Sequence, residues 1–133
     1  MAIDFSFEPE VEAVRLKVRD FIQNTVAPRM AEADAAGGGR GEMIEAIKDL
    51  RPKAYEQGYW LPHMPEEWGG MGLGPTALAA VSAEAGKVSI GPYILNCQAP
   101  DEGNMHTLLH FGTEAQKEKY LRPLCEGKSR SCF

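Results

Sequence analysis

Apolar side chains recur at steps of three and four residues along most of the chain, the spacing of one buried helix face. The pattern is clear from Pro9 onward, where a proline suits the first helical position and Glu8 and Glu10 complement the helix dipole. The apolar positions of this first segment are Val11, Val14, Val18, Phe21, Ile22 and Val26. Because proline is poorly tolerated inside a helix, we expect the helix to end near Pro28 and residues 31–41 to form a flexible connection.

Five further helical segments are predicted by the same criteria. They span about residues 42–57, 75–87, 89–98, 102–111 and 113–124. Pro52 predicts either a kink in the first of them or two short helices that meet near Leu50. Gly58 is placed to end that segment in a left-handed conformation. Thr113 and Gln116 match a capping box, which marks the start of the last helix.

A glycine-rich loop, residues 65–74, separates the two helical halves and also contains Trp68. Dense glycine lets backbones approach closely, so we expect an ordered elbow that Trp68 anchors and that carries no catalytic group. The predicted fold is all-α: one orthogonal domain of about six helices over residues 1–133, with this glycine-rich loop at its centre. Residues 129–133 are the one stretch that could begin a strand.

Composition narrows the possible partners and compartments. The formal charge of -5 argues against nucleic acid or an anionic membrane as a partner, because no basic stripe offsets the excess of carboxylates. Cys97, Cys125 and Cys132 are odd in number and widely spaced, which fits reduced thiols better than a disulfide framework. No apolar run approaches the roughly 20 residues of a membrane span, and the early helical pattern leaves no room for a targeting segment. These features predict a cytoplasmic protein.

Candidate chemistry is sparse in this sequence. Glu102, His106 and His110 lie four residues apart on one helical flank, but no further ligand pattern accompanies them, so the sequence assigns no metal site and no catalytic residue. His63 is isolated in sequence and is expected to have a structural role. The glycine loop lacks the Gly-Lys-Ser/Thr ending of a phosphate cradle. The small-residue segment 77–86 suits either a tightly packed helix or a thin wall beside a ligand.

Two motifs, taken together, resemble those of one enzyme family. Residues 65–73, Pro-Glu-Glu-Trp-Gly-Gly-Met-Gly-Leu, resemble the P-x-x-[YW]-G-G-x-G loop of acyl-CoA dehydrogenases. Residues 111–121 resemble the G-[ST]-x-x-Q-K-x-x-[YW]-L helix start of the same family, in the same order along the chain. Residues 96–105 are similar to the branch that contains family members ten and eleven.

The resemblance implies the N-terminal helical domain of that family, which in full-length members precedes a β-domain and a C-terminal four-helix bundle. It implies α,β-dehydrogenation of an acyl-CoA thioester: a carboxylate base removes the α-proton and FAD accepts a hydride from the β-carbon. This chain is expected to be truncated before the β-domain. Because the base belongs to the C-terminal domain, the chain is expected to be inactive alone.

The resemblance also assigns roles to a few positions. Helices at residues 76–86 and 92–111 are expected to line the acyl-chain cavity, with Gln98 and Glu102 as substrate-binding residues near its base. Phe133 is the one expected cofactor contact, toward FAD. The implied partners are acyl-CoA and an electron-transfer flavoprotein, and the full-length protein is expected to form a homo-oligomer, a dimer or a tetramer. The alternative is a stand-alone helical interaction module that has kept the fold and lost the reaction.

Overall fold

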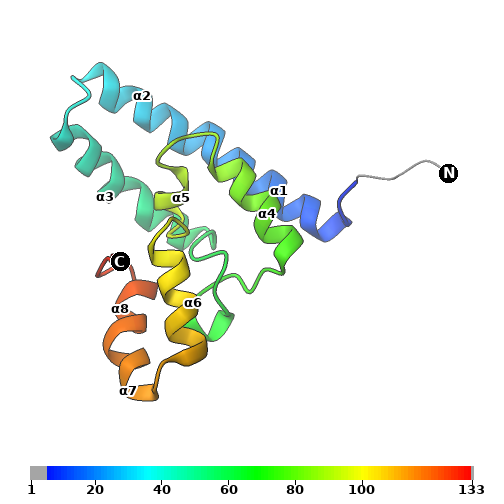
Figure 1. The fold of residues 1–133 in the computed structure, drawn as a ribbon. Helices are drawn as coiled ribbons and strands as arrows, with labels where there is room; N and C mark the ends of the chain where they lie inside the picture. The colour runs from blue at the N-terminus through cyan, green and yellow to red at the C-terminus, as the bar shows by residue number, and fades with distance from the viewer. Residues whose placement is uncertain (1–5, 133) are drawn as a thin grey trace.

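The computed structural model describes residues 6–132, and within that range every regular element is helical. Figure 1 shows α1 and α2 as one long rod, with α3 running back beside α2 and α4 lying along α1. The elements are α1 (Pro9–Phe21), η1 (Ile22–Val26), α2 (Ala27–Ala35), α3 (Arg40–Glu56), η2 (Glu66–Trp68), α4 (Pro75–Ala85), α5 (Gly91–Ile94), α6 (Asp101–Phe111), α7 (Glu114–Gln116), η3 (Lys117–Leu121) and α8 (Arg122–Cys125). Because consecutive elements merge, they form six continuous helical stretches and one 3₁₀ turn, which confirms the predicted all-α fold.

The first helix does not end at Pro28, so the predicted connection over residues 31–41 is wrong. A π-helical turn, η1, precedes the proline, and the backbone N–H of Ala27 bonds to the carbonyl of Ile22 five residues earlier. The wider turn makes room for a proline ring that would clash with an ordinary helical turn. The helix therefore continues to Ala35, and only a short turn that includes the glycines at 37–39 leads into α3.

A second π-helical turn precedes Pro123. The π-helical turn η3 ends just before α8, with the N–H of Arg122 bonded to the carbonyl of Lys117, and Pro123 follows directly. In α3, by contrast, Pro52 lies inside one unbroken helix, so the expectation of two short helices is wrong. The predicted helix at 89–98 is reduced to α5. Residues 129–132 form no strand.

Two hydrophobic clusters form the interior. The larger lies among α1, α2, α3, α4 and α5, and the smaller lies among the loop at 60–64, α6, η3 and α8. The fully buried large side chains of the first are Val18, Phe21, Ile22, Val26, Leu50, Val81, Ile94 and Leu95. Those of the second are Leu61, Met64, Met105 and Leu121. No helix among the described residues has both the length and the hydropathy needed to cross a membrane.

The small-residue helix α4 packs against α1, and Ala80, Val81 and Ala85 are buried. One face of α4 is therefore packed on α1, whereas Ala79, Ser82 and Ala83 are exposed, and a ligand beside this helix stays a prediction. The same helix also carries a buried carboxylate, Glu84, whose side chain is only 4% exposed. Arg15 and Arg19 of α1 reach it at 2.5 and 2.8 Å.

The glycine loop folds back on the segment that precedes it. The N–H groups of Gly70, Met71 and Gly72 bond to the carbonyls of Pro65, Leu61 and Met64 respectively. Trp68 packs on the second hydrophobic cluster, and the guanidinium of Arg122 lies 4.9 Å from its ring centroid. The loop is thus an elbow tied down by its own backbone, as the sequence predicts.

Replacing Gly70 by alanine tests the close approach inside this elbow. A Cβ at Gly70 would lie 2.0 Å from the Met64 carbonyl oxygen, so the backbone must shift, and we expect G70A to lose roughly 1–3 kcal/mol of unfolding free energy. Gly74 is the control, because a Cβ there meets nothing within 4 Å. Gly74 is the N-cap of α4, where alanine is less favourable than glycine, so we expect G74A to cost no more than about 0.5–1 kcal/mol in urea denaturation. Equal effects of the two substitutions would contradict the close approach.

The Glu84 ion cluster predicts acid sensitivity. Hydrogen bonds from Arg19, together with those from Lys87 and Arg15, outweigh burial and lower the pKa of Glu84 from its usual 4.5 to about 2. Because the folded pKa is the lower one, the stabilisation is complete above pH 4.5 and is lost as the pH falls toward 2. We expect Glu84→Gln to cost roughly 2–3 kcal/mol at neutral pH and much less at about pH 3.

The matched control is Glu45→Gln. Glu45 pairs with Lys48 at the surface, where the side chains are 65% and 67% exposed, so its loss is expected to cost less than about 0.5 kcal/mol. Urea unfolding at both pH values measures the difference. The stabilising role of the ionised Glu84 carboxylate would be refuted by either of two results. One is a Glu84→Gln protein as stable as the Glu45→Gln protein, and the other is a loss of unfolding free energy that does not depend on pH.

Candidate functional site

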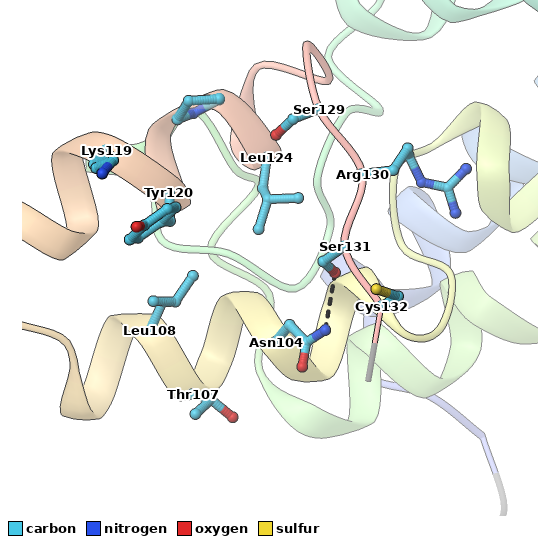
Figure 2. Close-up of a pocket in the computed structure, with 11 residues that line it drawn as sticks. Asn104, Thr107, Leu108, Lys119, Tyr120, Leu124, Ser129, Arg130, Ser131 and Cys132 are labelled. Carbon is cyan, nitrogen blue, oxygen red and sulfur yellow. Dashed lines mark hydrogen bonds between the residues drawn. The ribbon is translucent and has the colours of Figure 1, made fainter.

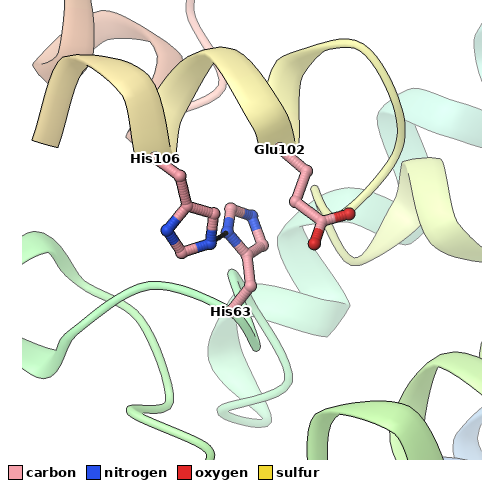
Figure 3. A group of neighbouring side chains, drawn as sticks. All are labelled: His63, Glu102 and His106. Carbon is pink, nitrogen blue, oxygen red and sulfur yellow. Dashed lines mark hydrogen bonds between the residues drawn. The ribbon is translucent and has the colours of Figure 1, made fainter. Parts of the chain in front are cut away.

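The segment that leads into α6 carries the two predicted substrate residues. The side-chain amide of Gln98 donates a hydrogen bond to Asp101 Oδ2 at 2.6 Å. Its Oε1 atom is buried and has no hydrogen-bond partner among the described residues. Glu102 lies half-buried in the first turn of α6, and its carboxylate is on the His63 side of the histidine pair (Figure 3). The two positions are neighbours but face different surroundings, and their role toward substrate stays a prediction.

Asp101 fixes the C-terminal segment of the chain against α6. Its carboxylate, 1% exposed, accepts hydrogen bonds from the Ser131 N–H at 2.7 Å, from the Ser131 hydroxyl at 2.6 Å and from Arg130. Burial acts to raise the pKa of Asp101, but the hydrogen bonds from Ser131 and Arg130 outweigh it and hold the pKa below its usual value. The Asp101 side chain thus binds residues 130–131. The predicted cofactor residue, Phe133, lies outside the described residues.

An open groove of about 510 Å³ runs between α6 and the η3–α8 stretch, with residues 129–132 along one side (Figure 2). The amide of Asn104 closes one end by donating to the Ser131 hydroxyl at 2.9 Å. The lining is mixed: Leu108 and Leu124 are apolar and Lys119 is cationic, whereas the guanidinium of Arg130 points away from the groove (Figure 2). The other lining residues are Thr107, Tyr120, Pro123, Ser129 and Cys132. The volume lies within the usual range of small-molecule pockets.

A second group of polar side chains lies on another flank of α6. His63 Nδ1 is 3.2 Å from His106 Nε2, and the His106 and His110 rings stack with centroids 6.1 Å apart. Burial lowers the pKa of His63 to about 4, so its imidazole is neutral at neutral pH. The predicted flank of Glu102, His106 and His110 exists, but the structure adds His63, which lies 43 residues from His106 in sequence. No local signal in the sequence indicates that contact.

The three cysteines are free thiols. Burial raises the pKa of Cys97 and that of Cys125 to about 12 in each case, which leaves almost no thiolate at neutral pH. Because the thiolate is the reactive form, neither residue is placed for nucleophilic chemistry. Cys132 is exposed and lines the groove.

The glycine loop does not fit the diphosphate of a dinucleotide such as FAD. A phosphate cradle needs backbone N–H groups that point at the ligand, and here those of Gly69 through Leu73 all bond to carbonyls of residues 61–66. The described residues therefore offer no diphosphate cradle in this loop.

Residues 8–128 match the family profile described as "Acyl-CoA dehydrogenase, N-terminal domain". Acyl-CoA dehydrogenase family member 11 of Gallus gallus is 37% identical over 128 residues, which cover 92% of this chain and 16% of that protein. FadE2 of Mycobacterium tuberculosis, a probable acyl-CoA dehydrogenase, is 36% identical over 98% of this chain and 33% of its own length.

The fold gives the same result. A solved structure from Mycobacterium abscessus, described as an acyl-CoA dehydrogenase, superposes with a TM-score of 0.81 and 31% identity. The match covers 95% of this chain and 34% of that one. The chain thus spans about a third or less of the relatives it matches. It belongs to the acyl-CoA dehydrogenase family and corresponds to that family's N-terminal helical domain.

Proposed function

We propose that this chain acts as the N-terminal helical domain of an FAD-dependent acyl-CoA dehydrogenase, an oxidoreductase that converts acyl-CoA thioesters to α,β-unsaturated products. The observation that supports this most strongly is the likeness in fold and sequence over 95% of the chain to a protein described as a member of that family. The catalytic base and most of the flavin site would lie in the other two domains, and the isolated chain would be inactive.

In this proposal the chain supplies one wall of the acyl-chain cavity. The segment from Gln98 through α6 would form its base, with Gln98 and Glu102 nearest the substrate. Phe133 would contact the flavin, which supplies the hydride acceptor when bound. No described residue of this chain is assigned a step in the reaction.

The proposed partners follow from the same reasoning. Acyl-CoA would be the substrate, an electron-transfer flavoprotein would accept the electrons, and the full-length protein would form a dimer or a tetramer. Exposed aromatic side chains are available for contacts with other domains, since Phe111 is 84% and Tyr120 is 49% exposed. A cytoplasmic location remains part of the proposal.

A domain exchange tests this proposal. The chain would replace the N-terminal domain of FadE2 from Mycobacterium tuberculosis, and the hybrid would be purified together with the 133-residue chain alone. We expect the hybrid to retain FAD and to lose its flavin absorbance when an acyl-CoA from a chain-length series is added without oxygen. The chain alone is expected to carry no stoichiometric FAD and to show no turnover.

FadE2 without its N-terminal domain is the control, and it is expected to be inactive because one wall of the cavity is missing. A folded, flavin-loaded hybrid that no acyl-CoA can reduce would contradict the proposal and favour an interaction module. Stoichiometric FAD and turnover in the 133-residue chain alone would contradict the claim that the isolated domain is inactive.

A further inference from the structure

Three side chains with metal-binding atoms meet between the loop at residues 59–65 and α6 (Figure 3). His63 comes from the loop, and Glu102 and His106 lie one turn apart on the helix. Their ligand atoms all lie within 4.8 Å of one another. We propose that His63 Nδ1, His106 Nε2 and a Glu102 carboxylate oxygen bind one Zn²⁺ ion. This inference does not rest on the proposed dehydrogenase function.

The spacing of the two histidines matches that of adjacent zinc ligands. Two nitrogens, each about 2.0–2.1 Å from a tetrahedral zinc ion, are about 3.3 Å apart. His63 Nδ1 and His106 Nε2 are 3.2 Å apart. The Glu102 carboxylate is held by no hydrogen bond or ion pair among the described residues, so rotation of its side chain can bring an oxygen into the third position.

The other ring nitrogen of His63 orients this ligand. His63 Nε2 lies 3.3 Å from the main-chain carbonyl of Asn96. A carbonyl oxygen only accepts hydrogen bonds, so Nε2 carries the proton and the lone pair is on Nδ1, which faces His106. Metal-binding histidines commonly donate their second N–H to a carbonyl in this way, which fixes the tautomer and the ring orientation. Asn96 therefore acts as a positioning residue for the proposed site.

A pocket opens beside two of the three proposed ligands, His63 and His106, and gives room for a water as the fourth ligand. A pocket of about 300 Å³ is lined by His63, His106 and His110 on its polar side, with Met64 and Leu109 among its apolar walls. Three protein ligands and an open position are the arrangement of zinc sites that bind an exchangeable water. The ion would link the loop at 59–65 to α6. Without metal, the same 3.2 Å spacing is filled by a hydrogen bond from His106 Nε2–H to His63 Nδ1.

Calorimetric titration of Zn²⁺ into the metal-stripped, tag-free 133-residue chain tests the site. All proteins carry Cys132→Ser, because the exposed Cys132 thiol is a competing zinc ligand. We expect one ion per chain, and at least tenfold weaker binding in His106→Gln and in Glu102→Gln. His110→Gln is the matched control, because this exposed histidine stacks on His106 but is not part of the ligand set. The zinc affinity of this variant is expected to stay within about twofold of that of the parent.

Two further readouts separate loss of a ligand from loss of fold. Circular dichroism must show the same helix content in every variant, and Co²⁺ in place of Zn²⁺ should give the intense visible bands of a four-coordinate ion. Mg²⁺ is expected not to bind, because it prefers six oxygen ligands. The proposal fails if no 1:1 binding occurs, if His106→Gln and Glu102→Gln bind as tightly as the parent, or if His110→Gln loses as much affinity as His106→Gln.

Discussion

The junction around Asn96 connects the two hydrophobic clusters. Its backbone is left-handed, with a φ of 56°, a conformation that asparagine tolerates better than most residues. Its buried side-chain amide donates to the Leu124 carbonyl at 3.0 Å, and its main-chain carbonyl faces His63. The Trp60 indole N–H donates to the Cys125 carbonyl at 2.8 Å beside it. Because Asn96 directly follows Leu95 of the first cluster and bonds to Leu124 of the second, it links the two clusters, and the Trp60 bond ties the loop at 60–64 to α8 within the second.

The arrangement of α6 and its neighbours depends on this junction. Directly after Asn96 the chain turns through Gln98 into α6, where Asp101 binds the C-terminal segment. The junction therefore sets the position of the open groove and of the histidine pair together. Removing a buried partner here would leave an unpaired polar group, which costs about 1–3 kcal/mol. A substitution at Asn96 would thus disturb packing, groove and histidine geometry at once.

Local signals in the sequence were sufficient for much of the fold. The capping box at Thr113 and Gln116 and the left-handed Gly58 are both confirmed, because each depends on residues close in the chain. Prolines were harder to interpret. A π-helical turn absorbs Pro28, and no simple sequence rule predicts where such a turn replaces a break.

The candidate sites were less predictable because they depend on tertiary contacts. The flank of Glu102, His106 and His110 follows from helical spacing alone, whereas the position of His63 depends on how a distant loop folds. Likewise, Glu84 is an ordinary surface residue by sequence and becomes buried only when α4 packs on two arginines of α1. The roles of Gln98, Glu102 and Phe133 toward substrate and flavin remain predictions.

Two probes of unfolding in urea test most directly whether the Asn96 junction couples the two hydrophobic clusters. Fluorescence of Trp60 and Trp68, the two tryptophans, reports on the second cluster, and far-ultraviolet circular dichroism reports on all helices. If the clusters are coupled, both probes show one coincident transition, and Asn96→Ala lowers the unfolding free energy by roughly 2–3 kcal/mol. Asn96→Gly is expected to lose less, because glycine adopts the left-handed backbone conformation without strain. Two separate transitions in the unmodified chain, or an Asn96→Ala protein of unchanged stability, would contradict this coupling.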